Sequence, residues 1–162
     1  AAFTAAWVEE TRGNHDIAID LARRGRDQAP DRVSRAYASM ILSFALIGKG
    51  ACDEATKILD DVVPELEQFG ISQWHGFAVA LAAETHRLAG DLDVAHSLAE
   101  RALEVVVRSS NWYGVGFAQR VTGRIASDCG EAVRARTSLQ SAAETFERIG
   151  DVVRALGYPT ET

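Results

Sequence analysis

The sequence is poor in cysteine and proline, the residues that mark covalently braced or irregular proteins. It has two cysteines, Cys52 and Cys129, and three prolines among 162 residues. Two cysteines are too few for the disulfide framework of a small secreted domain. We therefore expect free thiols, a reducing compartment and a cytoplasmic location.

Long apolar runs are also missing. Residues 40–48 form an apolar stretch, but Ser43 interrupts it and Lys49 follows it, whereas a membrane helix needs roughly 18 uninterrupted apolar residues. We expect no membrane partner. The chain starts at Ala1 with neither a methionine nor a basic leader, which predicts a fragment of a longer polypeptide and not a signal peptide.

An excess of basic charge is absent too. The formal net charge is -6, and residues 51–111 carry eleven acidic side chains against four basic ones. A protein that binds nucleic acid normally concentrates lysine and arginine on one face. This distribution argues against nucleic acid as a partner of the chain.

Motifs for chemistry are equally sparse. None of the four histidines has a cysteine or histidine neighbour at the spacing of a zinc finger or ribbon. Residues 48–50 (GKG) lack the spacing of a phosphate-binding loop. Acidic pairs such as Glu9 and Glu10 have the polar neighbours of a solvated helix face. The sequence thus predicts a protein that is not an enzyme and has no cofactor and no metal.

What the sequence does contain is an internal repeat. Gly50, Gly90 and Gly130 lie 40 residues apart, and Gly13 lies 37 residues before the first of them. An alanine follows each glycine by five residues, and a small residue precedes each by seven: Ala18, Ala55, Ala95 and Ala135 after, Ala6, Ser43, Ala83 and Gly123 before. A further column reads AYA, GFA and GFA at 36–38, 76–78 and 116–118. Periods of this length are typical of stacked helical repeats.

Small residues at both positions let two helices approach within roughly 8 to 10 Å, and glycine ends the first helix because it accepts a left-handed conformation. Apolar residues recur at three and four residues, as in a helix, and not at two. We predict first helices at 1–12, 31–49, 72–89 and 112–129, and second helices at 15–28, 52–69, 92–109 and 132–149. Asp31, Ser72 and Asn111 are the expected N-caps, and Pro64 should kink its helix.

The predicted fold is therefore all-α: a right-handed α-solenoid of about four antiparallel helix pairs in one domain. The repeats span about 1–30, 31–70, 71–110 and 111–150, and residues 151–162 read as a truncated further helix or tail. Exposed apolar residues at such an end, here Val153 and Leu156, could bind a second copy of the chain. Self-association through the solenoid end is thus an open alternative.

The small residue and alanine that flank each glycine resemble the signature of tetratricopeptide repeats. The usual period is about 34 residues, so this version is long and divergent. Residues 111–118 (NWYGVGFA) and 146–151 (FERIGD) are similar to the roughly 40-residue repeats of bacterial LuxR-type and maltose-regulon-activator-like signalling ATPases. That resemblance implies a sensor and oligomerisation arm. HEAT or armadillo repeats also have a period near 40, but they do not explain the small-residue columns.

First helices line the concave face of such a stack, where a partner would bind. The residues expected to project there are Trp7, Tyr37, Met40, Phe44, Phe77, Glu84, Arg87, Phe117, Arg120 and Arg124. Arg120 and Arg124 could engage the carboxylates of a peptide. The aromatics at 37, 77 and 117 could equally be core between repeats, and the arginines would then be solvated surface charge.

Three functions fit this pattern. We favour a regulatory protein-interaction arm of a bacterial signalling or transcription-regulatory protein. The alternatives are a free-standing adaptor that binds a peptide in its groove, and a small-molecule sensor with an apolar pocket near Trp7, Tyr37 and Phe44.

Overall fold

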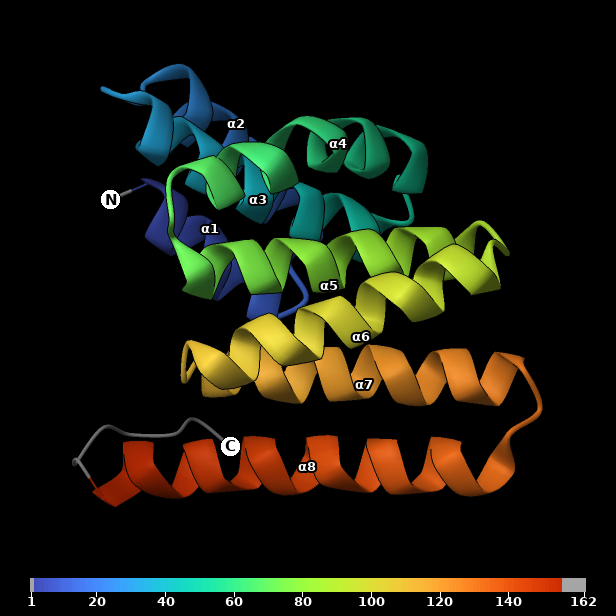
Figure 1. The fold of residues 1–162 in the computed structure, drawn as a ribbon. Coiled ribbons are helices and arrows are strands. Elements are labelled where there is room, and N and C mark those ends of the chain that lie inside the picture. Colours follow the sequence, from blue (N-terminus) through green and yellow to red (C-terminus); the bar gives the residue numbers. More distant parts are fainter. Residues whose placement is uncertain (1, 156–162) are drawn as a thin grey trace.

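The computed structural model describes the backbone of residues 2–155 and the side chains of residues 4–150. Within this range the chain forms eight α-helices and no strand (Figure 1). They are α1 (Ala2–Thr11), α2 (His15–Asp27), α3 (Arg32–Lys49), α4 (Cys52–Gln68), α5 (Ser72–Leu88), α6 (Leu92–Arg108), α7 (Trp112–Asp128) and α8 (Ala132–Ala155). The first seven agree with the predicted ranges to within one residue at each end. No helix in the described range is both long and apolar enough to cross a membrane.

The helices stack as four consecutive pairs, from α1 and α2 at one end to α7 and α8 at the other (Figure 1). Each helix contacts the next along the chain, and the first helices also contact each other: α1 with α3, α3 with α5, and α5 with α7. Within the described residues the backbones of the second helices do not come close to one another, and these helices meet through long side chains, as in the ion pairs Arg23–Glu54 and Arg101–Glu67. Because the stack is tighter along its first helices, these helices lie on the inner side of its curve. The predicted α-solenoid is confirmed.

The two small-residue columns lie where helices of a pair cross. Ala6, Ser43 and Ala83 are fully buried, and so are Ala18, Ala55 and Ala95 on the second helices. A Cβ atom added to Gly123 would lie 2.7 Å from Cγ of Leu139 on α8. The repeat in the sequence is therefore a packing requirement, as predicted.

The predicted glycine turns are present. Gly50 has φ 84°, a left-handed conformation in which a side chain is strained. Its N–H donates to the carbonyl of Ile47, and the N–H of Ala51 donates to the carbonyl of Leu46, so the last carbonyls of α3 are satisfied. Gly13, Gly90 and Gly130 have the same positive φ.

Two of the three predicted N-caps are confirmed. The side chain of Asp31 accepts a hydrogen bond from the N–H of Ser34 at 2.7 Å, and that of Asn111 accepts one from the N–H of Gly114 at 3.0 Å. The prediction for Ser72 was wrong, because α5 begins at that residue and follows Ile71, which has no side-chain cap. The expected kink at Pro64 does not interrupt α4, which runs continuously from Cys52 to Gln68.

The expected break after residue 149 was also wrong. Helix α8 runs unbroken from Ala132 to Ala155, through Gly150. Glycine ends a helix only when it takes a left-handed conformation, and inside a helix it costs only about 1 kcal/mol. No separate helix starts at Asp151. The side chain of Val153 and the whole of Leu156 lie outside the described residues, so self-association through the solenoid end stays a prediction.

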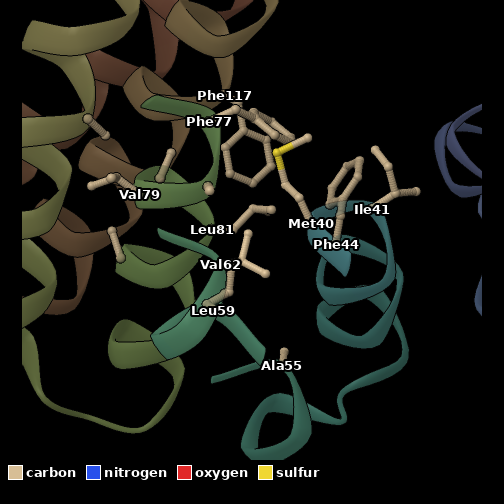
Figure 2. Close-up of a cluster of buried hydrophobic side chains, with 14 of the residues drawn as sticks. Met40, Ile41, Phe44, Ala55, Leu59, Val62, Phe77, Val79, Leu81 and Phe117 are labelled. Carbon is tan, nitrogen blue, oxygen red and sulfur yellow. The ribbon is translucent and has the colours of Figure 1, made fainter. Parts of the chain in front are cut away.

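A single apolar core runs through the stack. Leu59, Leu66 and Leu81 are almost completely buried in it. Figure 2 shows Met40, Phe77 and Phe117 together in this core, although they come from three different helix pairs. The core therefore reaches the inner side of the curve, where the candidate site lies.

Candidate functional site

The ten residues predicted for the concave face line two separate pockets, one charged and one aromatic. Phe44, Glu84, Arg87, Phe117, Arg120 and Arg124 line the first, and Trp7, Tyr37, Met40 and Phe77 line the second. Met40, Phe77 and Phe117 are also buried core residues, exposed by only 1–2%. The choice between core and groove differs from residue to residue. Phe77 and Phe117 belong to the core and also line a pocket, whereas Tyr37 is half-buried.

An aromatic cluster separates the two pockets. It consists of Trp7, Phe44, Phe77, Tyr113, Phe117 and Phe146, whose rings contact one another with centroids 4.9–5.8 Å apart. Trp7 of α1 contacts Phe77 of α5 at 5.2 Å and Tyr113 of α7 at 4.9 Å. The cluster therefore crosses the concave face from the first helix pair to the fourth.

The charged pocket, called here the arginine pocket, has a volume of about 580 Å³. It lies where the carboxyl-terminal ends of α1, α3 and α5 face α7. Its charged lining consists of Glu10, Glu84, Arg87, Arg120 and Arg124, joined by His15. Phe44, Ile47 and Leu88 add apolar surface, and Leu88 is 47% exposed. Its volume falls in the usual range for ligand sites, about 300–1,000 Å³.

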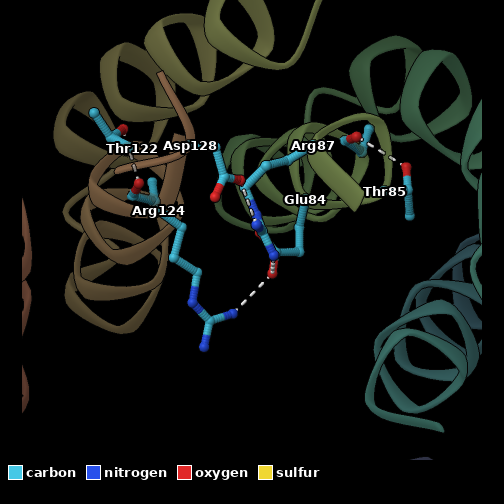
Figure 3. A network of polar contacts seen from close by, with 8 residues as sticks. Glu84, Thr85, Arg87, Thr122, Arg124 and Asp128 are labelled. Carbon is cyan, nitrogen blue, oxygen red and sulfur yellow. Dashed lines mark hydrogen bonds and ion pairs between the residues drawn. The ribbon is translucent and has the colours of Figure 1, made fainter. Parts of the chain in front are cut away.

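Glu84 organises the arginines of this pocket. Its carboxylate is 4% exposed and accepts hydrogen bonds from Nε and Nη2 of Arg87 at 2.8 and 3.1 Å, and from Nη1 of Arg124 at 2.7 Å. Arg87 also donates to Asp128 at 2.6 Å, so it bridges α5 and α7 (Figure 3). The hydrogen bonds to Glu84 raise the pKa of Arg87. Arg87 is therefore fully committed to protein partners, whereas Arg124 is 45% exposed and has donors to spare.

Arg120 differs from the other two arginines. Its guanidinium lies 4.8 Å from the centroid of the Phe117 ring, a cation–π geometry. Its Nε atom is buried without a hydrogen-bond partner, and no carboxylate of the described residues forms an ion pair with it. Burial, followed by the neighbouring charge of Arg124, lowers the pKa of Arg120. Nε is closed to solvent, so an anion would reach Arg120 through its terminal nitrogens, where the partly buried charge would stabilise it.

Glu10 and His15 form the opposite wall of the arginine pocket. Nδ1 of His15 lies 2.8 Å from Oε2 of Glu10, which is only 6% exposed. Burial raises the pKa of Glu10, and the hydrogen bond from His15 opposes that rise. A Cβ atom on Gly48 would lie 2.5 Å from the His15 ring, so glycine makes room for the pair. The sequence alone did not indicate a partner for His15. The space for its pairing with Glu10 is left by Gly48 of α3, and no spacing rule links the start of α2 to that residue.

The second pocket, called here the aromatic pocket, has a volume of about 140 Å³. It lies near the amino-terminal ends of α3, α5 and α7. Trp7, Tyr37, Met40, Trp74, Phe77 and Tyr113 line it, with the amides of Gln73 and Asn111. The ring centroids of Tyr37 and Trp74 are 4.1 Å apart. Burial raises the pKa of Tyr37. Tyr113 lines both pockets.

Trp74, Tyr113 and His15 were the main pocket residues that the sequence did not nominate. Tyr113 aligns with Gln73 in the repeat, so its column carries no aromatic pattern. Trp74 lies three residues before the aromatic column at Phe77. This helical spacing was a signal that Trp74 and Phe77 share a face of α5. A contact across the curve of the stack has no local signal.

The groups in the two pockets differ from those of a metal site. In the described part of the chain, no three or more His, Cys, Asp or Glu side chains come close enough to hold a metal ion. Cys52 and Cys129 are free, as predicted, and burial raises the pKa of the Cys52 thiol. The arrangement can bind an anion in one pocket and an apolar group in the other.

No family model and no curated protein matches this sequence. The class of the protein therefore rests on the helices themselves: it is an all-helical solenoid of four stacked pairs.

Proposed function

We propose that this chain is a non-catalytic protein-interaction domain that binds an acidic segment of a partner protein in the arginine pocket. The repeats resemble tetratricopeptide repeats and those of LuxR-type regulators. On that resemblance we assign the domain to the regulatory arm of a bacterial signalling or transcription-regulatory protein. Its two free thiols fit the cytoplasm.

The observation that carries this proposal is the state of Arg120. Its charge is partly buried, its Nε has no partner, and Phe117 holds it in place. Rigidly held arginines that lack a counter-ion are suited to bidentate recognition of a carboxylate. Arg124 lies close enough to lower the pKa of Arg120 and has donors that do not reach Glu84. Together the two arginines offer a site for one carboxylate group.

The surroundings of Arg120 favour a protein segment as the source of that carboxylate. Ile47 and Leu88 stand at the pocket beside the arginines, and Leu88 is largely exposed. An acidic residue with apolar neighbours would satisfy both surfaces. The aromatic cluster occupies the middle of the concave face, so a short segment fits better than one that follows the whole groove.

The proposal can be tested by selecting twelve-residue peptides from a phage-displayed random library on the immobilised domain. We expect the selected peptides to be enriched in aspartate or glutamate, and their Glu→Gln and Asp→Asn versions to bind less well. Arg120→Gln should weaken binding about 10- to 100-fold, because a hydrogen bond to a charged group contributes about 1.5–3 kcal/mol.

Arg136→Gln is the matched control, since it removes the same charge from an exposed site on α8 that lines neither pocket. It should leave binding unchanged. Selected peptides without acidic enrichment, or equal weakening by both substitutions, would overturn the proposal.

A further inference from the structure

The binding of an acidic segment leaves the aromatic pocket without a role. This pocket has a volume of about 140 Å³ and is walled by five aromatic rings and Met40. A cavity of about 150 Å³ with apolar walls is large enough to hold benzene. The space therefore matches one six-membered ring.

Loose packing does not explain the pocket. Near it, a Cβ atom on Gly76 of α5 would lie 2.7 Å from Val106, and one on Gly114 of α7 would lie 2.8 Å from the same residue. Two of the helices that frame the pocket, α5 and α7, are thus packed closely against α6. Protein interiors packed in this way contain few voids larger than a water molecule. The pocket is a preformed feature of the concave face.

The charge around the pocket selects the kind of group that fits. Aromatic walls can bind either a neutral ring or a methylated ammonium group. Among the residues whose side chains the structure describes, no charged one lines this pocket, so a cation would find no carboxylate from them there. Arg120 lines the neighbouring arginine pocket, on the other side of Tyr113, and its charge would repel a cation. A neutral ring is therefore the better occupant.

We propose that the aromatic pocket holds the aromatic side chain, of phenylalanine size, of the same partner segment whose carboxylate binds Arg120 and Arg124. This assignment rests on the proposed function for its partner. Tyr113 lines both pockets, so the two subsites lie side by side on the concave face. The partner segment then carries an acidic residue and an aromatic residue a short distance apart.

The chain provides its own reporter for this pocket. Two of its three tryptophans, Trp7 and Trp74, line the pocket, and the third, Trp112, is 56% exposed. In a Trp112→Phe background all indole fluorescence comes from the pocket walls. Iodobenzene is a suitable probe, because its heavy atom quenches an indole that it touches. We expect quenching that saturates with iodobenzene concentration.

A blocking variant and a matched control make the measurement specific. Gln73 is exposed at the edge of the pocket, and Gln68 is exposed at the end of α4 and lines neither pocket. Gln73→Phe should place a ring over the pocket and weaken saturable quenching at least tenfold, whereas Gln68→Phe should not. Quenching that rises linearly and equally in all variants would overturn the assignment. A saturable change in indole fluorescence with tetramethylammonium, but none with iodobenzene, would also overturn the assignment.

Peptides separate the two proposals. Among peptides selected on the domain, replacement of a phenylalanine or tyrosine by alanine should weaken binding about tenfold, and Gln73→Phe should abolish that difference. If iodobenzene binds but no acidic peptide does, the proposed function fails, and the aromatic pocket remains a site for a neutral ring. If acidic peptides bind with no aromatic preference, the proposed function stands and the assignment of an aromatic side chain fails.

Discussion

Trp7 and Tyr113 lie with their ring centroids 4.9 Å apart, although one belongs to the first helix pair and the other to the fourth. In a repeat protein each unit normally contacts only its neighbours, so stability is a sum of local terms. Here the curve of the stack brings distant pairs into direct contact. The first pair therefore contributes to the stability of the fourth.

Replacement of Trp7 by alanine should destabilise the domain by about 3 kcal/mol, the lower end for the loss of a tryptophan from a core, because Trp7 is only partly buried. Urea denaturation measures this change. Hydrogen exchange should also show loss of protection at the start of α7. Trp112→Ala is the control: Trp112 is 56% exposed, and its loss should cost less than about 1 kcal/mol. Equal costs would contradict the contact.

Ala95→Leu should destabilise the protein by about 1–3 kcal/mol, because Ala95 is fully buried where α6 crosses α5 and a larger side chain forces the helices apart. Ala143→Leu makes the same change at an exposed position of α8 and should be nearly neutral, since alanine and leucine have similar helix propensities. Thermal melts of both variants test the packing role of the repeat. A neutral Ala95→Leu variant would disprove it.

Glu84→Gln should change stability and anion binding in opposite directions. The carboxylate of Glu84 is buried and paired with Arg87 and Arg124, so its neutralisation should cost about 2–3 kcal/mol in unfolding free energy, less than for a fully buried pair. Arg124 would then be free for a ligand, and acidic peptides should bind more tightly. Fluorescence anisotropy with a selected peptide checks the second effect. Glu131→Gln, which alters the exposed pair with Arg134, should change neither quantity measurably.

The buried carboxyl of Glu10 predicts a particular pH dependence. Burial raises its pKa above the ordinary value of 4.5, so the folded state binds more protons than the unfolded state between pH 4.5 and the raised value. The contribution of Glu10 to the free energy of unfolding is therefore complete below pH 4.5, and it is lost as the pH rises through that window. Glu10→Gln should become more stable relative to the wild type from pH 4 towards pH 7. Glu147→Gln, at an exposed site on α8, should show no such trend in urea melts.

The sequence predicted most of the fold because the repeat encodes it locally. The glycine, alanine and small-residue columns fix the turn and the crossing of each pair, as at Gly50 and Ala55. Helix α8 departed from the prediction, because a glycine such as Gly150 can end a helix or lie inside one, and only its surroundings decide.

The candidate site was predicted in part. Residues at several fixed offsets from the small column were expected on the concave side, and Tyr37, six residues before Ser43, and Arg120, three residues before Gly123, were nominated in this way and line the pockets. The contacts that close the site were not found, since Trp7 meets Tyr113 only through curvature accumulated over four pairs. The pairing of His15 with Glu10 likewise depends on space left by Gly48.

The aromatic cluster also bears on how the domain responds to force. Under tension, a stack of helix pairs ordinarily lengthens elastically, and its pairs then unfold one after another. In this chain, rings from α1, α5 and α7 hold the inner side of the curve closed. A load applied along the stack would first have to part those rings. The domain should resist small forces as a stiff body and then yield in one abrupt step, carrying both pockets with it.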